Sequence, residues 1–127
     1  MLRVGVTGGR EFDDQQFVYD VLDQIHDHCE ITVLIHGAAR GLDTFAGDWA
    51  KSRGVEVKEF PAEWDKHGPK RAGFIRNRDM IVKGLPDVVL VFEGGNGTAD
   101  MRRQCDEHDV PIELIRPDHF KSRTTDE

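Results

Sequence analysis

The sequence of 127 residues contains only two cysteines, Cys29 and Cys105, and no long hydrophobic run. Two cysteines cannot build a disulfide framework, which predicts reduced thiols in a cytoplasm-like compartment. A membrane-spanning helix needs about 20 consecutive apolar residues, so no membrane association is expected. The amino terminus also lacks the pattern of a signal peptide. A cytoplasmic location is therefore predicted.

Basic residues are scarce: 17 lysines and arginines stand against 24 aspartates and glutamates, which gives a net charge of −7. This balance argues against a protein that coats nucleic acid, and nucleic acid is not the expected partner. Five basic residues nevertheless gather in a segment without any acidic residue: Lys66, Lys70, Arg71, Arg76 and Arg78. Such a segment in an acidic chain indicates a local anionic ligand, although a solvated helix face has the same pattern.

Short apolar segments alternate with segments of helical periodicity along the whole chain. Strands are expected at residues 2–6, 31–35, 55–60, 88–92 and 110–115, the third of them at a sheet edge because apolar and charged residues alternate there. Helices are expected at about 14–28, from Asp43 or Thr44 to 53, at 71–83 and from Thr98 through 108, with 61–69 as a polar loop. The alternation predicts one α/β domain over residues 1–116, with a five-stranded parallel sheet and helices on both faces. Residues 117–127 are expected to form a loose polar tail.

Four loops that follow strand ends carry the candidate site. They lie at residues 7–10, 36–43, 61–64 and 93–98. In sheets of this kind a ligand binds beyond the carboxyl ends of the strands, at the point where the strand order reverses. The four loops are therefore expected to line one crevice.

The segment Glu93-Gly94-Gly95-Asn96-Gly97-Thr98 gives the sharpest signal. It follows a buried strand, and Thr98 is expected to cap the next helix. Glycine permits a ligand to approach the backbone closely, and a helix amino end favours negative charge. We interpret the segment as a phosphate-binding loop, the alternative being an ordinary tight turn. No lysine follows as in a Walker loop, and no Gly-x-Gly-x-x-Gly follows the first strand, which disfavours a conventional NAD site.

Several side chains outside this loop could complete a nucleotide site. Arg40 could clamp a phosphate with two hydrogen bonds, and Arg76 could bind a second anionic group. Asn77 could hydrogen-bond a sugar or base, and Trp64 could stack on a base. The alternatives are close packing of the loop for Arg40, a charged helix surface for Arg76 and Asn77, and packing over the sheet edge for Trp64.

Histidine and cysteine residues give no comparable signal. His36 is expected to be a hydrogen-bonded structural histidine, and Trp49 has the spacing of a core residue. His26, His28 and Cys29 lie close together but straddle a helix end, and no matching second pair exists. No metal site is expected.

With these segments in place, the chain resembles the SLOG superfamily, and within it the YspA/cpYpsA-related branch. The resemblance rests on five segments in order: 8–10, 36–43, 61–64, 72–80 and 94–101. It implies a Rossmann-like, doubly wound domain that forms a homodimer, requires no cofactor, and binds a nucleotide or nucleotide-derived phosphorylated ligand as a sensing or carrier module. The ligand-binding residues expected are Gly8, Gly9, Arg10, Gly37, Arg40, Gly41, Asp43, Trp64, Arg76, Asn77, Gly94, Gly95, Asn96, Gly97 and Thr98.

The chain departs from the LOG phosphoribohydrolases of this superfamily at a position that bears on catalysis. Those enzymes carry Pro-Gly-Gly-x-Gly-Thr-x-x-Glu, whereas here Glu93 stands at the proline and Met101 at the glutamate. Cleavage of an N-glycosidic bond needs a carboxylate, which Met101 does not supply. The alternative function is a LOG-like nucleoside 5′-monophosphate phosphoribohydrolase, or a related nucleotide hydrolase, that uses Asp43, Glu93 or Asp100. Restoring the glutamate through Met101→Glu is the test that the sequence suggests.

Overall fold

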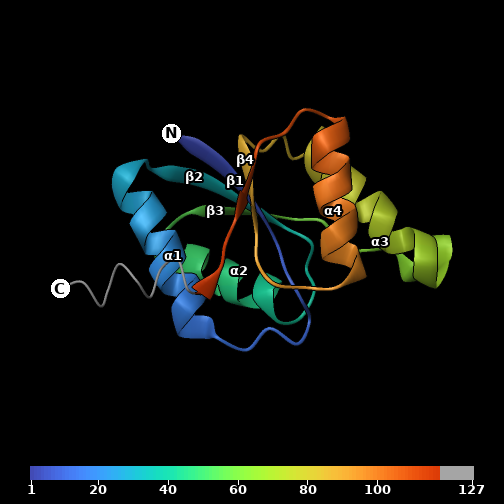
Figure 1. Cartoon of the computed structure of the whole chain (residues 1–127), viewed down its shortest axis with the longest axis horizontal. Helices are drawn as coiled ribbons and strands as arrows, with labels where there is room; N and C mark the ends of the chain where they lie inside the picture. The colour runs from blue at the N-terminus through green and yellow to red at the C-terminus, as the bar shows by residue number, and fades with distance from the viewer. Residues whose placement is uncertain (118–127) are drawn as a thin grey trace.

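A computed structural model describes residues 1–117, so the predicted tail lies outside the described residues except for Pro117. The elements follow one another as β1 (Leu2–Thr7), α1 (Gln15–His28), β2 (Ile31–His36), α2 (Leu42–Ser52), β3 (Glu56–Glu59), α3 (Trp64–Val82), β4 (Val88–Val91), α4 (Asn96–Glu107) and β5 (Ile112–Leu114). The five strands pair in parallel in the order β3-β2-β1-β4-β5 (Figure 1). This confirms the predicted α/β class and the edge position of β3.

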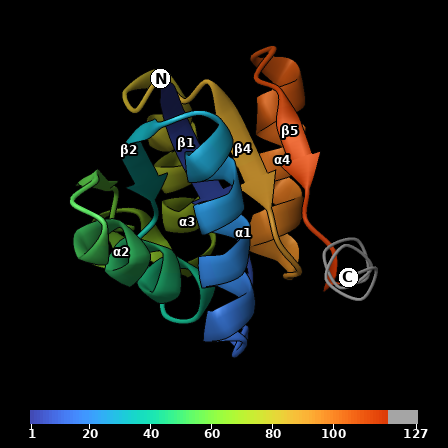
Figure 2. The same ribbon diagram turned by 90° about the vertical axis from the view of Figure 1, so that its left-hand side faces the viewer.

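Helices cover both faces of the sheet, as predicted: α1 and α2 lie on one face, α3 and α4 on the other (Figure 2). Each face has its own hydrophobic core, because successive side chains of a strand point to opposite faces. Leu34 packs in the first core with the fully buried Trp49 of α2, as expected for Trp49. Ile35 packs in the second core with Met80 of α3 and Met101 of α4. None of the helices within residues 1–117 is long and apolar enough to span a membrane.

The third helix begins earlier than predicted. Residues 64–67, expected in a loop, form a helical turn that ends in a kink at Gly68, where φ is 85°. Glycine adopts this conformation readily. Pro69 follows at the start of the continuing helix, where no N–H donor is needed. The additional turn matters because it carries Trp64.

Two of the predicted helix caps are wrong. The cap of α2 is Gly41 and that of α4 is Gly95, and neither helix has a side-chain cap hydrogen bond. Asp43 and Thr98 fall inside the first turns instead. Gly41 has a φ of 78°, and a Cβ there would collide with the backbone oxygens of the loop after β1. The first helix does have a side-chain cap close to its predicted start, because Asp14 accepts a hydrogen bond from the Phe17 N–H at 3.0 Å.

The strand order reverses next to β1. From β1 the chain runs outward to β2 and β3, and then returns to place β4 on the other side of β1. The loops after β1 and β4 therefore diverge, and such a divergence creates a ligand crevice in open α/β sheets. A backbone hydrogen bond of 2.8 Å from the Gly9 N–H to the Glu93 carbonyl joins the loop after β1 to the loop after β4.

Candidate ligand-binding site

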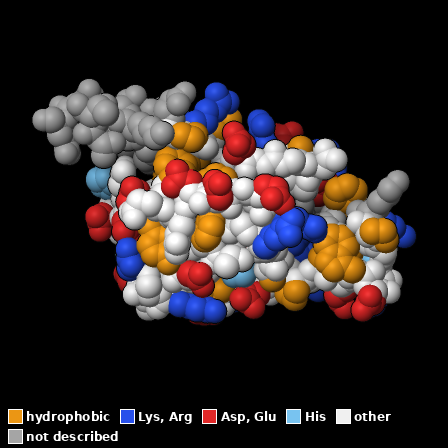
Figure 3. All heavy atoms as spheres, turned by 90° about the horizontal axis from the view of Figure 1, so that it is seen from below, with side chains coloured by type: hydrophobic (Ala, Val, Ile, Leu, Met, Phe, Trp, Pro, Cys, Tyr) orange, Lys and Arg blue, Asp and Glu red, His pale blue; other side chains and the backbone are white. Residues whose placement is uncertain are grey.

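A pocket of about 1000 Å³ lies at the edge of the sheet where the strands end. The loops after β1, β2 and β4 line it together with α3. Figure 3 looks onto this edge and shows basic, acidic and hydrophobic side chains next to one another. The volume is at the upper end of the range for small-molecule pockets, about 300–1,000 Å³.

Most of the predicted ligand-binding residues come together in this pocket. It is lined by Gly8, Gly9, Arg10, Gly37, Asp43, Trp64, Arg76, Asn77, Gly94, Gly95, Asn96, Gly97 and Thr98. Arg40 and Gly41 are not among the lining residues. The Arg40 guanidinium points to solvent and forms an ion pair with Glu11. Binding of a ligand by these residues stays a prediction.

Arg76 brings positive charge to the pocket wall. Its Nη1 donates to the Gly37 carbonyl at 2.6 Å, and its Nε donates to Asn77 Oδ1 at 2.9 Å. The guanidinium lies directly on the backbone of Gly37, where a Cβ would come within 2.9 Å of the arginine Cδ. Burial lowers the pKa of Arg76, and the nearby Asp43 carboxylate acts in the opposite direction. A half-buried guanidinium of this kind is a ready partner for a phosphate or carboxylate.

Asp43 places a carboxyl group in the same pocket. The side chain is buried and accepts hydrogen bonds from the Gly37 and Ala39 N–H groups at 3.1 and 3.3 Å. Burial raises the pKa of Asp43 to about 6, although those two hydrogen bonds and Arg76 favour the ionised form. A carboxyl group with this pKa exchanges its proton near neutral pH, which is a property of catalytic acids and bases.

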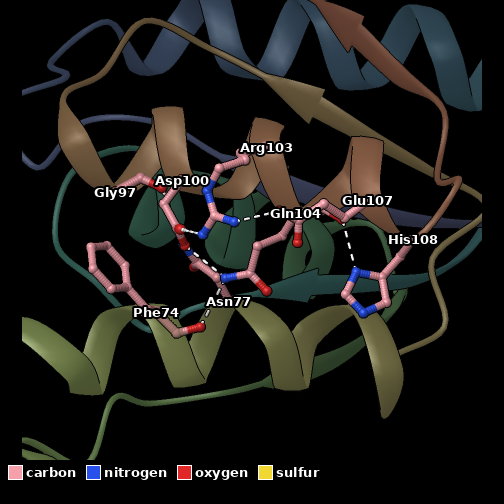
Figure 4. Close-up of polar contacts among 8 residues, drawn as sticks. All are labelled: Phe74, Asn77, Gly97, Asp100, Arg103, Gln104, Glu107 and His108. Atoms are coloured by element: carbon pink, nitrogen blue, oxygen red, sulfur yellow. Dashed lines mark hydrogen bonds and ion pairs between the residues drawn. The ribbon is translucent and has the colours of Figure 1, made fainter.

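The other two candidate carboxylates have different surroundings. Glu93 is exposed and lines the pocket. Asp100 is buried and does not line it. Its carboxylate accepts hydrogen bonds from Asn77 Nδ2 at 3.1 Å and Gln104 Nε2 at 2.7 Å, and pairs with Arg103 (Figure 4).

Asn77 links this network to the pocket. Besides the bond to Asp100, its Nδ2 donates to the Gly97 carbonyl at 3.1 Å, and its Oδ1 accepts from Arg76. The Asp100 carboxylate thus fixes the amide that orients the Arg76 guanidinium. It also fastens the amino end of α4 to α3. In the structure, Asp100 therefore positions Asn77 and, through it, the Arg76 guanidinium.

Met101 does not face the pocket. It is fully buried in the core between α4 and the sheet. A glutamate at this position would place its carboxylate among apolar side chains. The test suggested by the sequence is therefore unsuitable, because Met101→Glu would perturb folding before it could restore chemistry.

Trp64 and Arg10 meet across the pocket, a contact that sequence reasoning missed. The Arg10 guanidinium lies 5.4 Å from the Trp64 ring centroid, which is a cation–π arrangement. Trp64 remains 42% exposed. The contact joins the loop after β1 to the first turn of α3, which the sequence did not predict as helical.

Phe74 also lines the pocket and was missed. It belongs to the third predicted helix and is 47% exposed. The loop between β1 and α1 contributes further lining residues that were not predicted, among them Glu11, Phe12 and Asp13. These residues follow the first glycine-rich loop directly in the sequence, and that position could have indicated that they line the pocket.

His36 is structural, as predicted. Its Nδ1 accepts from the Ala38 N–H at 2.9 Å, and its Nε2 lies 3.6 Å from a Glu59 carboxylate oxygen. Burial lowers the pKa of His36, so the ring is neutral at neutral pH. No three His, Cys, Asp or Glu side chains within residues 1–117 are placed to hold a metal ion together.

Fold and site together define a Rossmann-like α/β domain with a pocket at the reversal of its strand order. Comparison with protein families goes further: the chain belongs to the YspA, cpYpsA-related SLOG family, whose model matches residues 2–67. This confirms the resemblance found in the sequence.

Two individual proteins extend the comparison. The chain is 37% identical over 120 residues to the Gene 61 protein of Mycobacterium phage D29. This match covers 88% of this chain and 94% of that protein. It superposes on the X-ray structure of DNA processing protein A (DprA) from Streptococcus pneumoniae with a TM-score of 0.70 and 19% identity, covering 89% of this chain. The match spans 50% of the DprA chain, so the present chain corresponds to half of that protein. At this identity the likeness shows the fold alone.

Proposed function

We propose that the protein binds a nucleotide or a nucleotide-derived phosphorylated ligand in this pocket, as a sensing or carrier module. The observation that carries the proposal is that Arg76 and the amino end of α4 meet at one pocket, tied together by Asn77. Gly95 caps α4 without any side-chain hydrogen bond. The first amides of a 12-residue helix are thus left to a ligand.

In this proposal the phosphate lies against the glycine-rich loop at 94–98. The Arg76 guanidinium neutralises its charge. Trp64 offers an aromatic face to a base, where it would replace or share the stacking of Arg10. Arg40 takes no part, because it does not line the pocket and its exposed side chain pairs with Glu11 at the rim. The name of the structural neighbour, a DNA processing protein, is consistent with a nucleotide-type ligand.

One observation favours a second candidate, a LOG-like hydrolase of nucleoside 5′-monophosphates. Asp43 lines the pocket, and its pKa is raised to about 6. Such a carboxyl group can orient water or stabilise the positive charge that develops on the sugar as an N-glycosidic bond breaks. Glu93 is the other carboxylate that reaches the pocket.

A binding and turnover assay separates the two candidates. Thermal unfolding is followed with AMP, GMP, CMP, UMP and inorganic phosphate, while release of free base is measured by chromatography. A ligand at 100 times its Kd stabilises the folded state by about 2.7 kcal/mol. Stabilisation without release supports the binding module, and base release that is lost in Asp43→Asn supports the hydrolase.

Three variants locate the binding. Arg76→Gln is expected to abolish the stabilisation, whereas Arg40→Gln is expected to retain it because Arg40 lies outside the pocket. Gly97→Ala adds a methyl group that meets no protein atom within 4 Å. It should therefore leave the unliganded protein as stable as before but weaken phosphate binding. Absence of stabilisation by every nucleotide would refute the proposal.

The proposal also includes a homodimer, as the resemblance to the family implies, and a cytoplasmic location, as the sparse cysteines imply. Size-exclusion chromatography with light scattering tests the first part. A mass of 14.4 kDa in solution would exclude the dimer.

A further inference from the structure

A second hollow lies beside the pocket. It is a groove of about 390 Å³ between α3 and α4. Arg71, Phe74 and Arg78 line it from α3, and Arg103 and His108 line it from the α4 side. Figure 4 shows Phe74 on α3, Arg103 on the facing α4, and His108 directly after the end of α4.

The charge of this groove differs from that of the chain as a whole, because its lining holds three arginines and one carboxylate, that of Glu107. Arg71 and Arg78 are seven residues apart, two helical turns or about 10.5 Å along one face of α3. Neither forms an ion pair with any residue of the described range 1–117, whereas Arg103 is paired with Asp100 and Glu107. Two guanidinium groups without an ion-pair partner among the described residues thus lie in line in a protein with a net charge of −7. Local attraction for a polyanion follows from this arrangement.

Phe74 connects the groove with the pocket. It lines both hollows and leaves 47% of its surface exposed. It sits at the third position after Arg71 and the fourth before Arg78, so its ring lies on the same helix face between the two charges. An exposed aromatic ring flanked by arginines is the combination on which single-stranded nucleic acids stack.

We infer that the ligand is the end of a short single-stranded oligonucleotide, which continues from the pocket past Phe74 into the groove. The inference rests on the proposed function, because the terminal nucleotide occupies the pocket. The next base stacks on Phe74, and the following phosphates lie beside Arg71 and Arg78. The pocket volume, already at the limit for a small molecule, agrees with a ligand larger than a mononucleotide. The negative net charge excludes broad coating of nucleic acid but not this local contact.

Fluorescence anisotropy tests the inference. The probes are 5′-phosphorylated, 3′-fluorescein-labelled hexanucleotides of mixed sequence, one of DNA and one of RNA, so that the two sources of the same chemistry are distinguished. We expect at least one to bind about tenfold more tightly than the best mononucleotide. Arg71→Gln/Arg78→Gln should lose this gain. For this double variant, the slope of log affinity against log salt concentration should be less steep by about 1.4. The reason is that each of the two lost phosphate contacts contributes about 0.7 to the slope for a single strand.

The matched control is Lys51→Gln/Arg102→Gln. It removes two exposed positive charges that lie in neither hollow. It should change neither the gain nor the salt dependence. A third variant, Phe74→Leu, keeps an apolar side chain but removes the stacking surface, and should weaken hexanucleotide binding with all charges present.

The inference and the proposed function fail in different ways. If a mononucleotide stabilises the protein but the hexanucleotides bind no more tightly, the inference is refuted and the proposed function stands. If neither a mononucleotide nor a hexanucleotide binds, the proposed function fails and the inference with it. If Arg71→Gln/Arg78→Gln changes the oligomeric state but not hexanucleotide affinity, the groove is an interface between two copies and the inference is wrong.

Discussion

Replacement of Asp43 by asparagine should stabilise the protein at neutral pH and lose this advantage in acid. The carboxyl group is buried and its pKa is raised from 3.8 to about 6. Above pH 6 the folded protein must hold an ionised carboxylate in a site that favours the neutral form. Since 1.36 kcal/mol corresponds to a tenfold change in proton affinity, raising the pKa from 3.8 to about 6 costs the folded state about 3 kcal/mol when the group is ionised.

The sign of the pH dependence follows from proton binding. Between pH 3.8 and 6 the folded protein binds the Asp43 proton and the unfolded chain largely does not. The contribution of this group to stability is therefore fully present below pH 3.8 and is lost as the pH rises through 6. Asparagine resembles the protonated acid, but its extra N–H groups need partners, which costs about 1 kcal/mol. We expect Asp43→Asn to be about 2 kcal/mol more stable than the wild type at pH 7.5 and about equal to it at pH 4.5.

Urea unfolding monitored by tryptophan fluorescence measures this difference. Trp49 is buried in the core and reports on unfolding. Asp48→Asn on the same helix is the control, because Asp48 is exposed and its replacement should stay within about 0.5 kcal/mol of the wild type at every pH. A stability difference for Asp43→Asn that does not change between pH 4.5 and 7.5 would refute the reasoning.

Three further predictions follow from buried groups. Asp100→Asn should destabilise the fold by about 1–3 kcal/mol in urea unfolding, because it weakens the hydrogen bonds that join α3 to α4; an unchanged midpoint would show that the network is not needed. Met101→Glu should abolish cooperative unfolding, since several kcal/mol are lost from a total of about 5–15 kcal/mol, whereas Met101→Leu should cost less than about 1.5 kcal/mol. A thiol reagent should modify Cys29 in the native protein and Cys105 only after unfolding, because Cys105 is buried and burial raises its pKa to about 11; rapid modification of two thiols in the native protein would contradict this.

The fold was predictable because its pattern is local. Apolar strands and amphipathic helices alternate along the chain, and that order is typical of a parallel sheet with helices on both faces. The glycine-rich loops were predicted to line one pocket for the same reason, since the ends of parallel strands meet at one edge. The edge position of β3 could also be predicted, because charged residues alternate with an apolar one at the start of Glu56–Glu59.

The helix starts were not predictable because distant groups decide them. At the start of α2 the Leu42 N–H donates to the Gly9 carbonyl, at 3.3 Å, on another loop. A backbone oxygen from elsewhere in the chain therefore satisfies the first amide of α2, and the Asp43 carboxylate accepts from the Gly37 and Ala39 N–H groups instead of capping the helix. Arg40 follows the same rule: its partner Glu11 lies 29 residues away, and only the folded chain shows that Arg40 itself does not line the pocket.

Three carboxylates that look equivalent in the sequence differ because of what surrounds them. Asp100 has its oxygens occupied by Asn77, Gln104 and Arg103, so it has no free edge to offer a substrate. Asp43 reaches the pocket and lies near Arg76. A phosphate bound to Arg76 would compete with Asp43 for the positive charge and would favour protonation of the acid. Binding and proton uptake are then coupled at one arginine, whether the pocket only holds its ligand or also cleaves it.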